Sequence, residues 1–596
     1  MGIAITQALI YLPYMLCLVF SVFVIPGLAI FPSLLESPWF ASILPVISIF
    51  IVNVIVILLL QLGIYTHISV ILITIGLTLL ALIRIILIKK HLQFKWSRED
   101  AKLFIINLSL LLPMIAVAGL STFSRADALT NWNLWAVYFY HSLPINHSMY
   151  PQLFPQFLSY CYQVFGSVEM QGPVRASLVI LPFAFMNAAI FYDDKNKVKC
   201  LPLFLIFVGG FIALFYKFFI EGYADPFNAI PVAFSAALLL KYFETKEESR
   251  YLFFGVFCGI VAYLSKQPAL VWGLFGAPAL FIVKFIKAKK LTLIEILAFA
   301  TIMLPAILWL IGPGSNFFDN RGVIQASTHN LHPGFYQYVV TLKNSLANYF
   351  IKQPFVLLIY ILAALAVIGR RYASTVFLIF VIPGTLLWFI LASYELREGL
   401  HVITTSVLLI ASVGFFHERI MLWFSGYRRF TDLIELHLTH ICIFFVFVGI
   451  TGFIIVSMSV IKNAQGHIYP LKAGKTLLYQ FFGKAAPDLY ENAYNHSNVM
   501  IWTAGNAYAR GIFYSHNPFS DDRGYTLQEA YDMLKQLKPN YVLTGGDITP
   551  SEDEIIQALS QHCVGLLLNL PTGNTPHQFK VYKVNQGILI KGKCQL

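Results

Sequence analysis

Apolar runs long enough to cross a lipid bilayer recur along the first 461 residues of this chain. A transmembrane helix needs about 20 predominantly apolar residues. Only 12% of the residues are charged, about half the share found in soluble domains. We therefore expect an α-helical polytopic membrane protein with about 14 transmembrane helices, near residues 8–30, 41–64, 67–88, 102–121, 173–192, 200–220, 229–243, 251–265, 268–286, 291–311, 354–369, 373–392, 400–416 and 438–461.

The basic residues indicate how these helices are oriented. A net charge of +12 can indicate a nucleic-acid partner, but here the lysines and arginines form short clusters between apolar runs. Cytoplasmic loops of membrane proteins carry such clusters, so we expect no nucleic-acid partner. With strictly alternating helices the clusters fall on one side, which we predict to be cytoplasmic: residues 89–98, 193–199, 241–250, 284–290, 369–372 and 417–429.

The other side, which we predict to be external, then receives the remaining connections, namely residues 122–172, 221–228, 266–268, 312–353 and 393–399, together with everything after residue 462. We therefore divide the chain into a transmembrane domain, residues 1–461, whose first large external loop is 122–172, and a second domain, residues 462–596.

The second domain has the pattern of a small α/β fold. Residues 498–505 and 540–547 are short apolar segments that end in glycine, and residues 578–585 alternate as a half-buried strand does. Residues 526–539 and 551–562 have helical periodicity with polar starts. We expect an external α/β domain, and whether its Cys563 and Cys594 form a disulfide stays open.

Unusual polar residues gather at external helix ends, first of all in the segment "DALTNWNLWAVYFYH" that begins at Asp127. We expect this segment to form an amphipathic helix in the interface, with Trp132 and Trp135 touching the bilayer surface and Asp127 and Asn131 near the other face. Asp127 is either a cap of this helix, since aspartate is a favoured cap residue, or a functional carboxylate.

Glu221 and Asp225 lie four residues apart in a short external loop between two spans. Such a pair can bind a divalent cation through oxygen ligands, hold a cationic substrate or position hydroxyl groups. The alternative is that they solvate the loop and cap the helix before Pro226. Whether a metal is required stays open.

Two cations accompany these carboxylates on the external side. Lys266 lies where two consecutive spans meet at a proline, and it either snorkels to the interface or holds a phosphate, since a charge at such a junction indicates function. Arg397 presents a planar donor fork suited to phosphate, or forms a salt bridge with Glu395 or Glu398.

Together these groups match the needs of glycosyl transfer from a lipid phosphate: carboxylates serve as a general base and hydroxyl ligands, and cations bind an anionic leaving group. The order of motifs also resembles the GT-C superfamily of integral-membrane glycosyltransferases, in particular a bacterial branch related to aminoarabinose and protein-mannosyl transferases. The motifs that carry the resemblance lie between about residues 100 and 460: "RADALTNWNLWA" (125–136), "YPQLFPQFLSY" (150–160), "EGYADPFNAIP" (221–231), "LSKQPAL" (264–270) and "YELREGLHV" (394–402).

The resemblance implies a role for each site. Asp127 would be the catalytic base that activates the acceptor, and Glu221 and Asp225 would form the second acidic site. Lys266 and Arg397 would contact the donor phosphate. Other motif residues expected to bind substrate are Arg125, Asn131 and Tyr150.

The function we expect is inverting transfer of a sugar from a polyprenyl-phosphate donor to a lipid, glycan or protein acceptor on the external face of the cell's inner (plasma) membrane. A single base suffices, because the phosphate is already a competent leaving group. A polysaccharide polymerase or ligase that uses lipid-linked glycans is the nearest alternative. A secondary transporter of an anionic solute is another, and it predicts charges near the bilayer midplane and two related halves. The sugar, the acceptor and the oligomeric state stay open.

Overall fold

A computed structural model gives the fold of the chain. It describes residues 6, 9–88, 95–123, 128–142, 151–192, 197–245, 248–311, 339, 342–344, 346–347, 354–391, 396–411, 425–464, 468–473, 476, 499–501, 541–545, 564–571 and 578–585.

The protein is a helical membrane protein. Within the described residues ten helical segments are long and apolar enough to span a membrane, with three shorter apolar helices beside them, and each span expected from the sequence overlaps a helix. The helical elements are α2 (Leu12–Leu18), η1 (Val19–Val24), α3 (Ile25–Ile30), η2 (Pro32–Glu36), α4 (Pro38–Ala41), α5 (Leu44–Gln61), α6 (His67–Ile88), α7 (Arg98–Gly119), η3 (Ala128–Asn133), α8 (Leu134–Tyr140), α9 (Leu153–Phe165), α10 (Gln171–Leu178), α11 (Ile180–Ile190), α12 (Leu201–Phe204), η4 (Leu205–Gly209), α13 (Gly210–Ile220), α14 (Asp225–Glu244), α15 (Ser249–Ser265), η5 (Gln267–Ala269), η6 (Trp272–Gly276), α16 (Ala277–Ala288), α17 (Leu293–Ile311), α21 (Pro354–Val367), α22 (Arg371–Val376), η8 (Phe377–Val381), α23 (Ile382–Leu391), η9 (Leu396–Gly399), α24 (Leu400–Ala411) and α26 (Ser425–Asn463).

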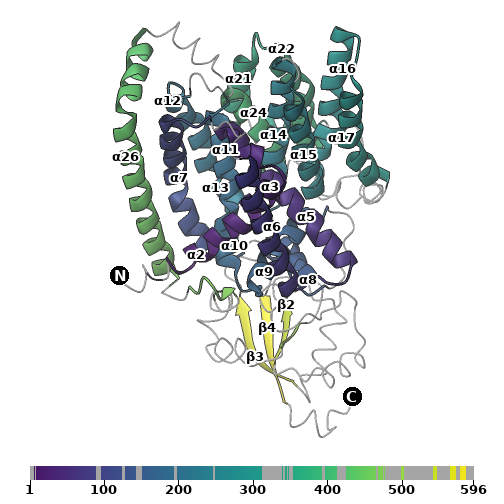
Figure 1. Ribbon diagram of the computed structural model, residues 1–596. Coiled ribbons are helices and arrows are strands. Elements are labelled where there is room, and N and C mark those ends of the chain that lie inside the picture. Colours follow the sequence, from purple (N-terminus) through teal and green to yellow (C-terminus); the bar gives the residue numbers. More distant parts are fainter. Residues whose placement is uncertain are drawn as a thin grey trace.

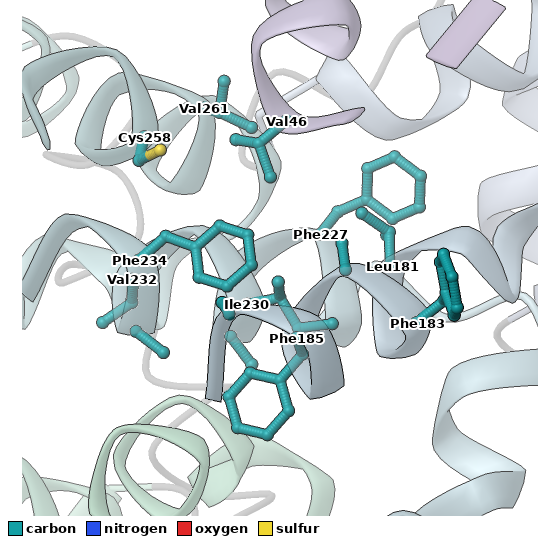
Figure 2. Packing of buried hydrophobic residues seen from close by; sticks show 14 of the residues in the cluster. Val46, Leu181, Phe183, Phe185, Phe227, Ile230, Val232, Phe234, Cys258 and Val261 are labelled. Carbon is teal, nitrogen blue, oxygen red and sulfur yellow. The ribbon is translucent and has the colours of Figure 1, made fainter. Parts of the chain in front are cut away.

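Helix α14 forms the centre of the bundle. No charged residue occurs between Asp225 and Lys241, and the helix is almost entirely buried against α15, α24 and α11. Figure 2 shows Phe227, Ile230 and Phe234 of α14 packed among side chains of α5, α11 and α15. The two ends of α14 are therefore fixed in position by the same core.

The outer helices present their apolar side chains to the surroundings. Helix α6 exposes large residues such as Leu72, Ile75 and Leu79 along its length, and α26 does the same while it packs along α7. Soluble monomers rarely expose contiguous apolar surface of this extent. These faces are those expected to contact lipid.

Helices α8 and α9 form a layer at one end of the bundle (Figure 1). Trp132 and Trp135 are only 3% and 4% exposed, with their ring centroids 5.2 Å apart. The Trp132 ring packs on Phe154 of α9, which packs on Phe227 of α14. The expectation that these tryptophans touch the bilayer surface is therefore wrong, because α9 supplies a second apolar face that covers them.

The C-terminal region contributes a four-stranded sheet near α8 and α9 (Figure 1). Its strands are β1 (Val499–Ile501), β2 (Tyr541–Gly545), β3 (Val564–Pro571) and β4 (Gln578–Val584), in the order β1-β2-β4-β3. β1 and β2 are parallel, whereas β4 is antiparallel to both of its neighbours.

Three of these strands lie where the sequence favours strands, whereas β3 was not expected. The helices predicted for residues 526–539 and 551–562 lie outside the described residues. The α/β character of this domain thus stays a prediction. Past α26, the Ala473 amide donates to the Glu169 carbonyl oxygen at 3.2 Å, which places the start of this region beside the N-terminus of α10.

Candidate functional site

The turn between α13 and α14 brings the sequence "EGYADPFN" to the end of the bundle. Helix α13 ends at Ile220, and Asp225 opens α14 with Pro226 in its first turn, a position that tolerates proline because the missing N–H has no helical acceptor there. Gly222 has φ +84°, and a Cβ at this residue would lie 2.2 Å from the Phe123 ring. Both the backbone conformation and the contact require glycine.

Lys266 occupies the junction between α15 and η5 in an extended conformation. The Asn228 side-chain amide donates to the Lys266 carbonyl oxygen at 2.8 Å, which fixes this backbone against α14. The Lys266 ammonium, in a residue only 5% exposed, donates to Asp225 Oδ1 at 2.7 Å and to Glu398 Oε1 at 2.8 Å.

Arg397 and Glu398 reach this point from η9, immediately before α24. An Arg397 guanidinium nitrogen lies 3.8 Å from Asp225 Oδ2, and the guanidinium stands over the Tyr223 ring at 4.3 Å. Gly399 packs so closely on Trp388 that a Cβ would lie 2.4 Å from the indole. This contact holds η9 against α23 and so positions both charged residues.

The four side chains form what we call the charge cluster: Asp225, Lys266, Arg397 and Glu398. Two cations and two carboxylates balance one another, as burial requires, because an unpaired charge in a low-dielectric interior is strongly unfavourable. Burial acts to lower the pKa of Lys266, but the carboxylates of Asp225 and Glu398 outweigh it and raise that pKa above its ordinary value. Lys266 is therefore protonated at neutral pH.

His401 adjoins the charge cluster from the first turn of α24. Its Nδ1 lies 3.1 Å from the Glu398 carbonyl oxygen, whereas its buried Nε2 has no hydrogen-bond partner among the described residues. A buried ring nitrogen without a partner is uncommon, so His401 keeps an unmade hydrogen bond beside the charge cluster.

Arg175 of α10 is a buried residue that the sequence interpretation missed. Its guanidinium donates to the Ile220 carbonyl oxygen at 2.8 Å, to Ser121 Oγ at 2.6 Å and to the Thr122 carbonyl oxygen at 2.5 Å. It also interacts favourably with the charge of Glu221. Arg175 thereby ties the residues that precede the Asp127 segment to the turn that leads to Asp225.

The structure brings together three of the residues predicted from the sequence, Asp225, Lys266 and Arg397, and adds Glu398 to them. Glu221 is half-buried at the end of α13, near Arg175. Asn131 is half-buried in η3. The remaining predicted site residues, Arg125, Asp127 and Tyr150, lie outside the described residues.

A metal site does not emerge in this part of the protein. In the described ranges no three His, Cys, Asp or Glu side chains gather closely enough to hold a metal ion. Asp225, the carboxylate proposed as a cation ligand, already faces Lys266 and Arg397. A divalent ion there would have to displace both cations.

Comparison with known proteins does not identify the chain: no family model matches it, and no curated protein is similar enough to count as a relative.

Proposed function

We propose that this protein is an inverting membrane glycosyltransferase that moves a sugar from a polyprenyl-phosphate donor to an acceptor. The observation that carries the proposal is the charge cluster. It joins three segments distant in sequence at one end of the bundle, and it lies beside the turn to which Arg175 fixes residues 121 and 122. Polar groups of this kind at a membrane protein's helix ends indicate function.

Lys266 and Arg397 are the proposed ligands of the donor phosphate. An ammonium has three donors, and Lys266 directs two of them to Asp225 and Glu398. The two carboxylates keep both cations charged and oriented before the donor arrives. Such preorganised cations stabilise the negative charge that develops on the leaving phosphate.

Asp127 is the proposed general base, which accepts the proton of the acceptor hydroxyl as this oxygen attacks the anomeric carbon. The bond from that carbon to the phosphate oxygen breaks on the opposite face, so that configuration inverts. We propose that the Glu221 carboxylate binds hydroxyl groups of the transferred sugar. The contacts of Asp225 with both cations favour an orienting role over direct sugar binding.

For location, we propose the inner (plasma) membrane, with the charge cluster and residues 462–596 on the external side. The basic connections support this orientation, because they alternate with the spans. The sheet and the α8–α9 layer lie at the same end of the bundle (Figure 1), so the proposal assigns both to one side of the membrane.

Mass spectrometry of lipid-linked and surface glycans from a deletion strain tests the proposal. We expect a polyprenyl-phosphate sugar to accumulate and one sugar substituent to disappear from its acceptor. Long glycan chains that are lost or shortened as a whole would indicate the polymerase or ligase instead. Unchanged glycans, together with altered uptake of an anionic solute, would indicate the transporter and refute the proposal.

A further inference from the structure

A second polar site lies at the opposite end of α14. Lys241 follows Asp225 by 16 residues on this helix, which corresponds to about 24 Å along the axis at 1.5 Å per residue. Near Lys241 a cavity of about 160 Å³ opens between α4, the C-terminal part of α14 and the start of α15. We call it the Lys241 cavity, and it is lined by Glu36, Ser37, Pro38, Trp39, Phe40, Lys95, Phe191, Lys241, Arg250 and Tyr251.

Positive charge predominates in the lining, with three cations against one carboxylate. Lys95, Lys241 and Arg250 come from three separate parts of the chain. Arg250 is in part balanced, because it lies 2.8 Å from Glu248 and 3.6 Å from Glu36. Lys241 also interacts with the charge of Glu244. These carboxylates offset the cations in part, but the lining itself holds three cations and one carboxylate and therefore favours an anion.

Aromatic rings hold two of these cations in place. The Lys241 ammonium lies 4.5 Å from the centroid of Trp39 and 4.6 Å from that of Tyr192, and it donates to the Tyr192 carbonyl oxygen at 3.0 Å. The Arg250 guanidinium lies 4.8 Å from the centroid of Phe40. Cations ordered in this way lose little further freedom when a ligand binds.

Trp39 adds an unmade hydrogen bond to the wall of the cavity. The residue is only 5% exposed, and its indole N–H has no acceptor among the described residues. Indole nitrogens usually find a partner when they are buried. A small rotation of the ring toward an anion in the cavity would give this N–H a hydrogen-bond acceptor.

We propose that the Lys241 cavity binds a phosphate-bearing anion, either the headgroup of an anionic phospholipid or free phosphate. The volume is far above the ~15 Å³ that one water molecule requires, so a tetrahedral anion has room. Basic pockets between transmembrane helices on the cytoplasmic side suit anionic headgroups, and the aromatic residues fit the interface level of a membrane. The inference rests on this cavity and on the proposed orientation of the helices, and not on the proposed glycosyl transfer.

Thermal unfolding of the full-length protein in detergent tests the proposal, with dioctanoyl phosphatidylglycerol, dioctanoyl phosphatidylcholine and inorganic phosphate as probes. A ligand that binds only the folded state raises the unfolding temperature in proportion to its affinity. We expect a rise with phosphatidylglycerol and none with phosphatidylcholine. A further rise with inorganic phosphate would identify free phosphate as a sufficient ligand, and no rise would identify the lipid headgroup. Equal responses to the two lipids, or no response to any probe, would overturn the proposal.

Variants of the residues that line the Lys241 cavity test where phosphatidylglycerol binds. Lys95→Gln/Lys241→Gln should weaken phosphatidylglycerol binding at least tenfold, because hydrogen bonds to charged groups are among the stronger ones. Lys95→Gln alone changes an exposed side chain and should leave the fold intact. This single variant should also weaken phosphatidylglycerol binding, so it serves as the test if the double variant unfolds. Lys290→Gln removes an exposed lysine after α16 that does not line the cavity, and it should bind as the wild type does. Wild-type affinity in the double variant would overturn the proposal.

Trp39→Phe tests the indole separately. It keeps an aromatic face for Lys241 but removes the N–H together with part of the bicyclic ring. Because the smaller ring leaves space in a packed core, we expect the ligand-free unfolding temperature to fall, and we expect the affinity of the variant for phosphatidylglycerol to weaken about tenfold. Unchanged affinity in Trp39→Phe would exclude Trp39 from the ligand set and overturn that part of the assignment.

Discussion

The Lys266 ammonium lies 2.7 Å from Asp225 Oδ1, with both side chains buried. The contact links the start of α14 to the junction of α15 and η5, two elements that meet at the end of the bundle. Because Glu398 and Arg397 complete the same group, a change in any one member leaves its partners with unmatched charge.

The first prediction concerns the stability of the charge cluster. Lys266→Met leaves two buried carboxylates without their shared partner, and breaking a buried ion pair in this way destabilises a protein by about 3–5 kcal/mol. Lys217→Met removes an exposed lysine near the same end of the bundle and should change stability by no more than about 0.5 kcal/mol. Denaturant unfolding in detergent compares them. Equal stability of the two variants would show that the cluster is not a stabilising unit.

A second prediction concerns pH. The Lys266 pKa is raised above its ordinary value of 10.5, so its contribution to stability is fully present below about pH 10 and is lost only as the pH rises through the raised pKa. The difference in unfolding temperature between wild type and Lys266→Met should therefore stay constant from pH 6 to pH 9. A difference that shrinks between pH 7 and pH 9 would mean that Lys266 deprotonates there.

The third prediction concerns donor binding. Arg397→Lys keeps the charge but removes the planar fork and its stacking on Tyr223, so these residues are not interchangeable at this position. We expect a KM for the lipid donor that is at least tenfold higher. Steady-state kinetics with purified protein provides the measurement, and Lys217→Gln serves as the control. An unchanged donor KM would remove Arg397 from the phosphate site.

The fourth prediction concerns the catalytic base. Asp127→Asn should lower turnover about 10²–10⁴-fold, the usual contribution of general-base catalysis, while the protein still inserts and binds the donor. Asparagine is itself a good helix cap, so this substitution preserves that alternative role. If capping were the whole role, Asp127→Asn would stay active and Asp127→Ala would lose about 1 kcal/mol of stability. The base would then have to be sought at Glu221.

The fifth prediction concerns topology. In a chain whose Cys563 and Cys594 are replaced by serine, His141→Cys and Asn585→Cys should react with a membrane-impermeant thiol reagent in intact cells. Lys290→Cys should react only after the membrane is permeabilised. All three residues are exposed, so a lack of reaction reports the membrane barrier. Labelling of Lys290→Cys in intact cells would invert the proposed orientation.

The positions of the spans could be predicted because each depends on a local run of apolar residues. The surroundings of Trp132 could not be predicted in this way, because its burial depends on Phe154 of a second helix and on the core beyond that helix. Considered alone, the Asp127 segment has the composition of an interfacial helix.

Glu398 illustrates a different limit of sequence interpretation. Its nearest cation in the sequence is Arg397, but the hydrogen bond it accepts comes from Lys266, 132 residues away. Pairing between neighbours in the sequence is a poor guide where helix ends converge. Arg175 did carry a signal, because it is a charged residue inside the predicted span 173–192, and such residues indicate a structural or functional partner.

The order of the charge cluster along the chain has a consequence for biosynthesis. Asp225 and Lys266 are synthesised first, 41 residues apart, and they carry opposite charges. Arg397 and Glu398 follow much later as adjacent residues that also sum to zero. In a chain inserted from its N-terminus, Asp225 and Lys266 can therefore pair before Arg397 and Glu398 exist. The later residues add no net charge to this pair, so the cluster stays electrically balanced while it is completed.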